Sequence, residues 1–317
     1  MSGRAFTSAF AGDLEAYLAF RQNMGHCDTA RVWYLRQFDA WCAGHDRTVF
    51  DQATVEGWVA AELERSGRRS WMSYIRDFGR WLQASRSGDA YVLSGRWIAP
   101  RVPPRPYLLS SCQIERFFAG AAALKSKSPW RWQAVAFFTL MHSCGLRTGE
   151  VRSLQPRQVN LDDGHVDIVW SKGNRSRTLP LTTEVSGALA ACDRALSAHF
   201  PSRGTFFVSA AGNQVTPESA GKAFARIWDE AGLARPPGGR QPRPYSFRHH
   251  FAYACLERWR RQGKDVTAML PYLSRYMGHA TFESTYYYIH TSPDFLAGYD
   301  QITREQSQSL LPEVGFG

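Results

Sequence analysis

The chain has 317 residues, enough for two domains that each bury a hydrophobic core. Its 44% hydrophobic and 14% aromatic content excludes a disordered or low-complexity protein. The formal net charge of +10 favours a polyanionic partner, nucleic acid first among them. Six scattered cysteines without a C-x-x-C pair are typical of reduced thiols. With no secretion leader and no apolar run of roughly 18 residues, we expect a cytoplasmic, nucleoid-associated protein without membrane contact.

Residues 1–88 predict a small bundle of four amphipathic helices. The helix that starts at Ser70 is the clearest, because one face carries Trp71, Tyr74, Ile75, Phe78, Trp81 and Leu82. An aromatic stripe at helical spacing is more often bundle core than a base-stacking surface, so we expect it to be buried. Residues 89–107 follow as a linker, which includes the basic, proline-rich segment Arg101-Val-Pro-Pro-Arg-Pro.

Residues 108–292 predict a mainly helical domain interrupted by one β-hairpin, and residues 293–317 a tail with a possible inter-subunit helix. The hairpin strands, His165–Trp170 and Arg175–Leu181, flank Ser171-Lys-Gly-Asn, and Thr205–Ser209 predicts a further short strand. The fold class is therefore mainly α with a small β-hairpin or sheet. A parallel nucleotide-binding sheet is disfavoured, because strands and helices do not alternate and no phosphate-binding loop is present.

Four segments of this second domain carry residues suited to phosphate chemistry. They are Gly145-Leu-Arg-Thr-Gly-Glu, Ser171-Lys-Gly-Asn-Arg-Ser-Arg-Thr-Leu-Pro, Pro244-Tyr-Ser-Phe-Arg-His-His-Phe, and Met277-Gly-His followed by Tyr286-Tyr-Tyr-Ile-His. Taken singly, each has an ordinary explanation as a salt-bridged arginine, a polar turn or a capped helix end. A metal site from His142, Cys144, His249 and His250 fits no zinc-ligand spacing, so we expect no metal or other cofactor.

Taken together, the four segments resemble the catalytic domain of the tyrosine recombinase family, the phage-integrase-type site-specific recombinases. The resemblance places the catalytic residues at Arg147, Lys172, Arg248, His279 and Tyr288, with Glu150 in support. Tyr245 departs from the family pattern, which usually has histidine three residues before the second arginine. A phenol can donate a hydrogen bond to phosphate but is no base near neutral pH.

The resemblance implies a mechanism in which two arginines bind one DNA phosphate while a tyrosine attacks it. Lys172 would protonate the departing 5′ oxygen, and a 3′-phosphotyrosine would keep the bond energy for rejoining without metal or ATP. Among Tyr286, Tyr287 and Tyr288, the resemblance favours Tyr288 as the nucleophile. It also implies a homo-tetramer on two synapsed double-stranded DNA sites, with a monomer in solution and partner recombinases left open.

The N-terminal bundle matches in position the DNA-clamping, core-binding domain of that family. Nine arginines are candidate DNA contacts, although a solvated helix face explains such side chains equally well: Arg31, Arg68, Arg69, Arg76, Arg80, Arg101, Arg105, Arg175 and Arg177. We expect an integrase or transposase of a mobile element. The alternatives are a nicking-closing enzyme like the type IB topoisomerases and a catalytically silent DNA-binding accessory protein.

Overall fold

The computed structural model describes residues 5–26, 29–67, 69, 71–98, 106–171, 175–238, 240–279 and 285. The chain divides into two compact units, Met1–Val102 and Pro103–Gly317, with the division inside the predicted linker. No helix among the described residues is both long and apolar enough to span a bilayer. The description below takes each unit by itself.

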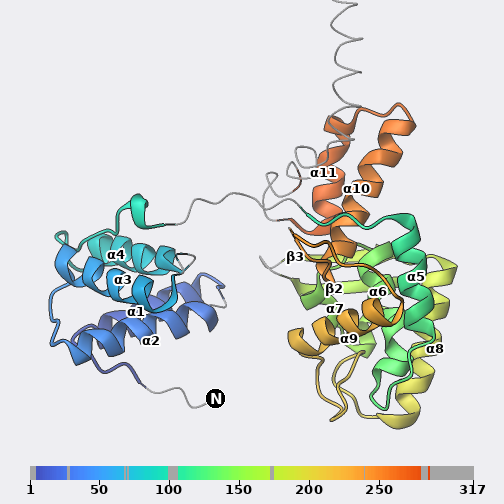
Figure 1. Ribbon diagram of the computed structural model, residues 1–317, viewed down its shortest axis with the longest axis horizontal. Helices are drawn as coiled ribbons and strands as arrows, with labels where there is room; N and C mark the ends of the chain where they lie inside the picture. Colours follow the sequence, from blue (N-terminus) through green and yellow to red (C-terminus); the bar gives the residue numbers. More distant parts are fainter. Residues whose placement is uncertain are drawn as a thin grey trace, which may run out of the picture. The chain divides into compact units, whose positions relative to one another are not determined.

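Unit 1 is a helical bundle (Figure 1), formed by α1 (Ala11–Asn23), α2 (Thr29–Gly44), α3 (Gln52–Ser66) and α4 (Met72–Ser85), with the 3-10 turn η1 (Gly95–Trp97) after them. Asp51 starts α3, where its carboxylate accepts a hydrogen bond from the Thr54 backbone N–H at 2.8 Å. The stripe on α4 is core as predicted: Trp71, Ile75, Phe78 and Leu82 are buried, and Tyr74 and Trp81 pack against them.

Unit 2 is mainly helical around one small sheet. Its helices are α5 (Ser111–Ala122), α6 (Trp130–Ser143), α7 (Thr148–Ser153), the 3-10 turn η2 (Pro156–Gln158), α8 (Thr183–His199), α9 (Pro217–Glu230), α10 (Tyr245–Arg261) and α11 (Val266–Met277). Most of the buried side chains of α5, α6, α8 and α9 belong to one hydrophobic cluster. The pair α10 and α11, orange in Figure 1, adds a second cluster that includes Leu256, Leu270 and Met277.

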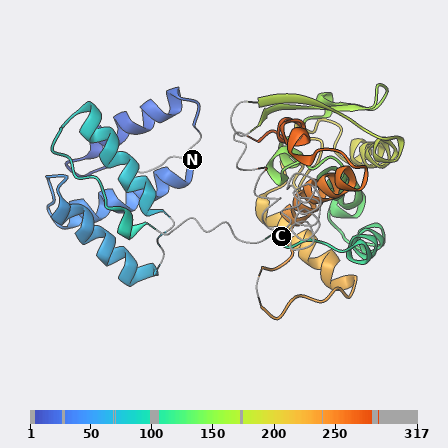
Figure 2. The same ribbon diagram turned by 90° about the horizontal axis from the view of Figure 1, so that it is seen from above.

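The predicted hairpin is present in a sheet of β1 (Val159–Asn160), β2 (His165–Ser171) and β3 (Arg175–Pro180), paired antiparallel in that order. Figure 2 shows the β2–β3 ribbon along one edge of unit 2. Val166 pairs with Leu179 and Ile168 with Arg177, so these four side chains share one face of the sheet. Because Val166, Ile168 and Leu179 are buried in the core, Arg177 also faces the protein interior.

The further strand predicted at Thr205–Ser209 is wrong, since the structure has only an isolated bridge between Val208 and Gln214 there. The side-chain amide of Gln133 takes the place of a neighbouring strand. Its Nε2 donates to the Val208 carbonyl at 2.8 Å, and its Oε1 accepts from the Val208 N–H at 3.0 Å. A buried side chain from α6 therefore satisfies the backbone groups that a strand would have paired.

Candidate active site

Arg147 lies between the end of α6 and the start of α7, where Glu150 holds it. Gly145 turns the chain after α6 with φ of 61°, and a Cβ at Gly145 would lie 2.4 Å from the Phe251 ring. Glu150 accepts hydrogen bonds from the Arg147 backbone N–H and from its Nη1, both at 2.8 Å. Nη2 of Arg147 donates to the Gly278 carbonyl oxygen at 2.6 Å. The turn after α6 and the end of α11 thus fix one guanidinium together.

Arg248 is in the first turn of α10 and is fully buried. Its Nη1 donates to the Gly145 carbonyl oxygen at 2.5 Å, and its Nη2 donates to the Met277 carbonyl oxygen at 2.7 Å. The Glu150 carboxylate lies 4.0 Å from Nη1, too far for a hydrogen bond but close enough for charge attraction. The two predicted catalytic arginines therefore lie on either side of one glutamate.

Arg177 is a third arginine at the same carboxylate, although the sequence suggested it only as a DNA contact. Its Nη1 and Nη2 donate to Glu150 Oε1 and Oε2 at 3.1 Å and 3.0 Å, and its side chain is 9% exposed. Burial alone would raise the pKa of Glu150, but hydrogen bonds and charges from Arg177 and Arg147 outweigh it and hold that pKa below its ordinary value. Three guanidinium groups thus surround a single ionised carboxylate.

His279 follows the left-handed residue Gly278 that ends α11, and its side chain is buried. Its Nδ1 lies 2.7 Å from Oγ1 of Thr285, a partner that the sequence reasoning missed. Burial, together with the positive charges of Arg248, Arg147 and Arg177, lowers the pKa of His279 to about 3. The imidazole is therefore neutral at physiological pH.

Tyr245, the first residue of α10, is 40% exposed. Its ring meets the His249 ring edge-on with the centroids 4.7 Å apart. Burial, together with the positive charges of Arg240 and Arg248, lowers the pKa of His249 to about 4. Tyr245 is thus a surface residue, one helical turn before the buried Arg248. Its hydroxyl is accessible to a ligand from the surface.

Lys172 and Tyr288 lie outside the described residues, as do Tyr286 and Tyr287. The structure therefore brings together Arg147, Glu150, Arg248 and His279 and says nothing of the predicted acid or nucleophile. Among the described residues no three His, Cys, Asp or Glu side chains are grouped as metal ligands. His142 and His250, considered for such a site, stack with ring centroids 5.5 Å apart.

The sequence model of the phage integrase family matches residues 108–294, which is more than half of the chain and includes every residue of the site. The chain belongs to the phage integrase family. This recombinase is 28% identical over 302 residues to a protein of Sinorhizobium fredii named as a candidate integrase/recombinase, y4rE, with 92% of this chain and 95% of that protein covered. It is 29% identical over 263 residues to the tyrosine recombinase XerC of Nitrobacter winogradskyi, with 75% and 76% covered.

The fold of the recombinase is similar to that of the Tn1549 transposon integrase, solved in complex with a circular intermediate DNA. The TM-score is 0.61 at 14% sequence identity, and the match covers 94% of this chain and 99% of the other. The family match and the similarity to XerC identify the protein as a tyrosine recombinase, an enzyme of DNA strand transfer, and the fold similarity agrees with this.

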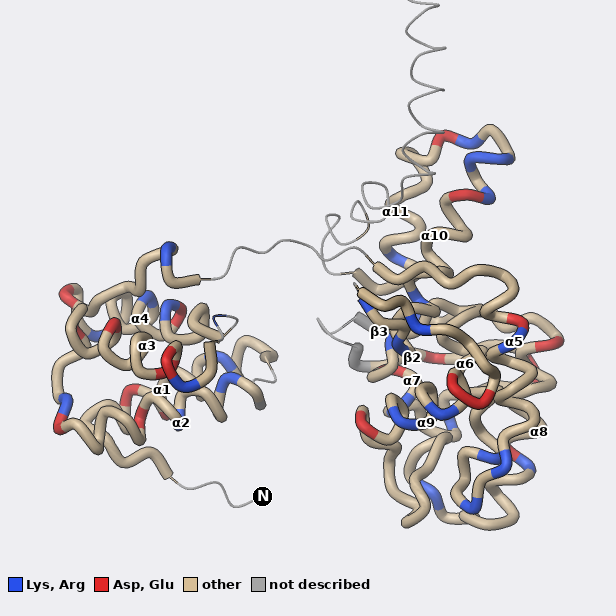
Figure 3. Tube along the Cα trace, viewed as in Figure 1, with Lys and Arg blue, Asp and Glu red and all other residues tan. Residues whose placement is uncertain are grey.

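The arginines suggested as DNA contacts differ in exposure. Arg69 and Arg80 are exposed and Arg76 is half-buried, whereas Arg31 is buried and the side chain of Arg177 is only 9% exposed, each with a carboxylate partner. Figure 3 shows Lys and Arg distributed over both units, so charge alone does not single out a DNA-binding face. Arg68, Arg101 and Arg105, and the side chain of Arg175, lie outside the described part of the chain.

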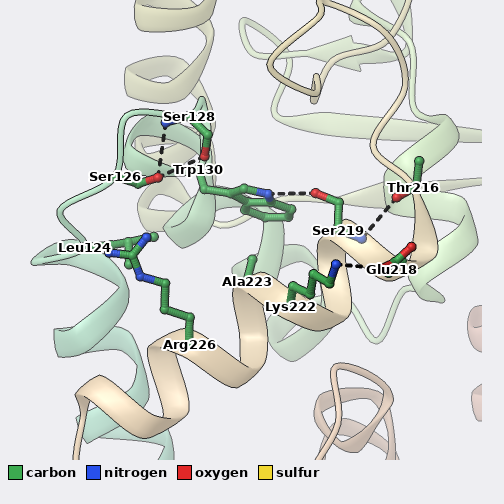
Figure 4. Close-up of a pocket in the computed structure, with 10 residues that line it drawn as sticks. All are labelled: Leu124, Ser126, Ser128, Trp130, Thr216, Glu218, Ser219, Lys222, Ala223 and Arg226. Carbon is green, nitrogen blue, oxygen red and sulfur yellow. Dashed lines mark hydrogen bonds and ion pairs between the residues drawn. The ribbon is translucent and has the colours of Figure 1, made fainter.

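A cavity of about 350 Å³ opens between the loop before α6 and the first half of α9 (Figure 4). Its polar groups are paired with one another: Trp130 Nε1 donates to Ser219 Oγ at 3.0 Å, and Lys222 lies 2.7 Å from Glu218. Trp130 begins α6, while Arg147 follows the other end of that helix, roughly 20 Å away at 1.5 Å per residue. This cavity is therefore separate from the catalytic site of the recombinase.

Proposed function

We propose that this recombinase cleaves and rejoins double-stranded DNA at specific sites through a 3′-phosphotyrosyl bond on Tyr288. The observation that carries the proposal is the convergence of Arg147, Arg248 and His279 around Glu150. These side chains come from three separate segments of the chain, and two of them, together with Arg177, bring three positive charges to one carboxylate.

Charge balance supports DNA phosphate as the ligand of this site. Arg147, Arg177 and Arg248 carry three positive charges, Glu150 carries one negative charge, and His279 is neutral. A partly buried site with excess positive charge binds an anion, and it binds most tightly the state in which negative charge grows. Attack on phosphorus creates that state, because the non-bridging oxygens gain charge as the new bond forms.

The proposed chemistry assigns one role to each group. The Tyr288 phenol gives its proton to solvent water as its oxygen forms a bond to phosphorus, the bond from phosphorus to the 5′ oxygen breaks, and Lys172 donates a proton to that oxygen. His279, with its pKa of about 3, is a poor acceptor for the phenol proton, so we assign it a hydrogen bond to the phosphate. Tyr245 would donate a second such bond from the surface. The 5′ hydroxyl of another strand then reverses the step without metal or ATP.

We further propose that the enzyme serves a mobile element as an integrase or transposase. The similarity to y4rE of Sinorhizobium fredii along 92% of this chain, and the fold shared with a transposon integrase, support this role. In this proposal unit 1 is the DNA-clamping domain, residues 89–107 the linker and residues 293–317 an inter-subunit tail. The working form is a homo-tetramer on two synapsed sites within the nucleoid.

A covalent trapping assay tests the proposal. The full-length enzyme is incubated with nicked duplexes made from the DNA that flanks its gene, and protein–DNA adducts are separated under denaturing conditions. We expect an adduct with the wild type, with Tyr286→Phe and with Tyr287→Phe, and none with Tyr288→Phe. An adduct that survives Tyr288→Phe would reassign the nucleophile. Relaxation of supercoiled DNA without any target sequence would instead indicate a topoisomerase.

A further inference from the structure

Arg177 is an arginine on the inward face of a strand, with only 9% of its side chain exposed, and its partner explains why it is there. It shares the inward face of the sheet with Val166, Ile168 and Leu179, where a charged side chain is strongly disfavoured unless it is paired. The Glu150 carboxylate supplies that pairing through two parallel hydrogen bonds of 3.1 Å and 3.0 Å. No other described side chain donates to both oxygens of Glu150.

We propose that Arg177 is a positioning residue for strand cleavage, which holds Glu150 from the β3 side so that the carboxylate does not draw the Arg248 guanidinium away from the DNA phosphate. The inference rests on the proposed function, because it assigns Arg248 to phosphate binding. It replaces the expectation that Arg177 itself contacts DNA.

The distances around Glu150 show how this positioning works. Arg177 occupies both carboxylate oxygens, while Arg147 Nη1 takes one of them at 2.8 Å and Arg248 Nη1 stays 4.0 Å from the other. Without Arg177, the Glu150 carboxylate would lose its bidentate partner, and we expect it to attract the Arg248 guanidinium to hydrogen-bonding distance. A guanidinium paired with Glu150 would then have to break that pair before it could bind phosphate.

Arg177 also joins the hairpin to the turn that precedes His279. A Cβ at Gly278 would lie 2.8 Å from Arg177 Nη1 and 3.5 Å from Arg147 Nη1, so both guanidinium groups pack directly on this glycine. Gly278 also accepts the 2.6 Å hydrogen bond from Arg147. Since Lys172 is only five residues before Arg177 in the sequence, the contact fixes the strand that follows the proposed general acid.

The first test compares three variants of the full-length enzyme in single-turnover cleavage at saturating nicked DNA. Arg177→Met removes the charge but keeps the length of the side chain, and we expect a cleavage rate about 100-fold lower with unchanged DNA affinity. Arg177→Lys should recover part of the rate, because it restores charge without the forked geometry. Thr178→Ala is the control, because Thr178 follows Arg177 on β3 but lies on the outer face of the sheet. This variant removes only a hydrogen bond to Asp167 and should cleave at the wild-type rate.

A double-mutant cycle separates action through Glu150 from any other action. If Arg177 works only by holding Glu150, then Arg177→Met should add no further loss to Glu150→Gln. The proposal would be overturned if the decreases in cleavage rate caused by Arg177→Met and Glu150→Gln multiplied in the double mutant. It would also be overturned if Arg177→Met weakened DNA binding and left the cleavage rate at saturating DNA unchanged. Either result would return Arg177 to the candidate DNA contacts.

A structural readout keeps this inference distinct from the proposed function. In a crystal structure of Arg177→Met without DNA, we expect Arg248 Nη1 to move from 4.0 Å to within hydrogen-bonding distance of Glu150. This measurement does not depend on catalysis, so it stands even if the wild type forms no covalent adduct. An unchanged distance would contradict the positioning role, and Arg177→Lys is the substitute if the methionine variant does not fold.

Discussion

Both units of the recombinase bury arginine, but they balance its charge differently. In unit 1, Arg31 donates to the Tyr17 hydroxyl at 2.8 Å and to Asp77 at 3.2 Å, and its guanidinium lies 4.4 Å from the centre of the Tyr74 ring. Among the described residues, that cation meets one carboxylate and aromatic faces. In unit 2, three guanidinium groups share the single carboxylate of Glu150. We infer that the pairing in unit 1 serves the stability of the bundle, whereas the excess positive charge in unit 2 favours the binding of an anion.

The largest expected effect tests the unbalanced cluster directly. Arg248→Ala should lower the single-turnover cleavage rate about 1000-fold, because it removes a charge that stabilises the transition state. Arg258→Ala, an exposed arginine on the same helix, is the matched control and should cleave at the wild-type rate. If Arg248→Ala lowered the cleavage rate by less than about tenfold, the arginine cluster of unit 2 would not have the proposed catalytic role.

The next effect compares the two carboxylates. Glu150→Gln leaves three arginines without a counter-charge and should lower the free energy of unfolding of unit 2 by about 3–5 kcal/mol. Asp77→Asn in unit 1 should lower that unit's stability by about 1 kcal/mol, since Asp77 is 38% exposed and screened by water. Hydrogen exchange of the full chain in urea resolves the two units. Sulfate should stabilise Glu150→Gln more than Asp77→Asn, and equal stabilisation would contradict the anion-binding interpretation.

Acid should weaken unit 2 before unit 1. The folded-state pKa values of His279 and His249, about 3 and about 4, are below the ordinary value of 6.5, so the unfolded chain binds these protons more readily. The resulting stability is complete above pH 6.5 and is lost as the pH falls toward those folded-state values. Between pH 6.5 and 5 the loss should be on the order of 2 kcal/mol for each histidine.

Hydrogen exchange at pH 7 and pH 5 measures this difference in the full chain. The described part of unit 1 buries no histidine, so its exchange-derived stability should change less over the same interval. His279→Gln and His249→Gln should each flatten the pH dependence of unit 2. Equal acid sensitivity of the two units would show that these histidines are not the cause.

The smallest effect concerns DNA binding by unit 1. Arg80→Ala, an exposed change on α4, should reduce the slope of log affinity against log salt by about 1 if this side chain contacts a phosphate. Arg31→Met should leave the slope unchanged and instead lower the melting temperature, because Arg31 is paired inside the bundle. A salt slope that changes for Arg31→Met and not for Arg80→Ala would reverse these assignments.

Much of the fold could be predicted because its signals are local. The stripe on α4 and the helical character of α10 and α11 follow directly from apolar periodicity and turn residues. The start of α5 also carries a local signal. Ser110 is the capping residue there, and its hydroxyl accepts from the Gln113 N–H while Gln113 reaches back.

The predictions failed where a distant side chain decides the structure. The apolar run before Ser209 has the composition of a strand, but Gln133 on α6 satisfies its backbone instead. Nothing near Val208 in the sequence could reveal that partner. The bond between His279 and Thr285 was missed in the same way, because the spacing of six residues fits no regular helix contact.

The sequence singled out most of the residues that the structure groups around Glu150, but not the contacts between them. The spacing of three residues between Arg147 and Glu150 correctly suggested that the glutamate braces the same turn. The pairing of Arg177 with Glu150 was not predicted, although a signal was available: Arg177 alternates with Leu179, which places it on the buried face of its strand. An arginine at an inward position needs a buried partner, and that rule would have pointed to Glu150.

The anchors of Arg147 and Arg248, the two arginines proposed to be catalytic, have a consequence for genetics. Carbonyl oxygens of Gly145, Met277 and Gly278 hold the guanidinium groups, and every amino acid supplies such an oxygen. Replacing Met277 by leucine should therefore leave the enzyme active. At Gly145 and Gly278 any larger residue would distort the chain that presents those oxygens. A selection for inactive alleles should accordingly recover changes at these two glycines about as readily as at the arginines they orient.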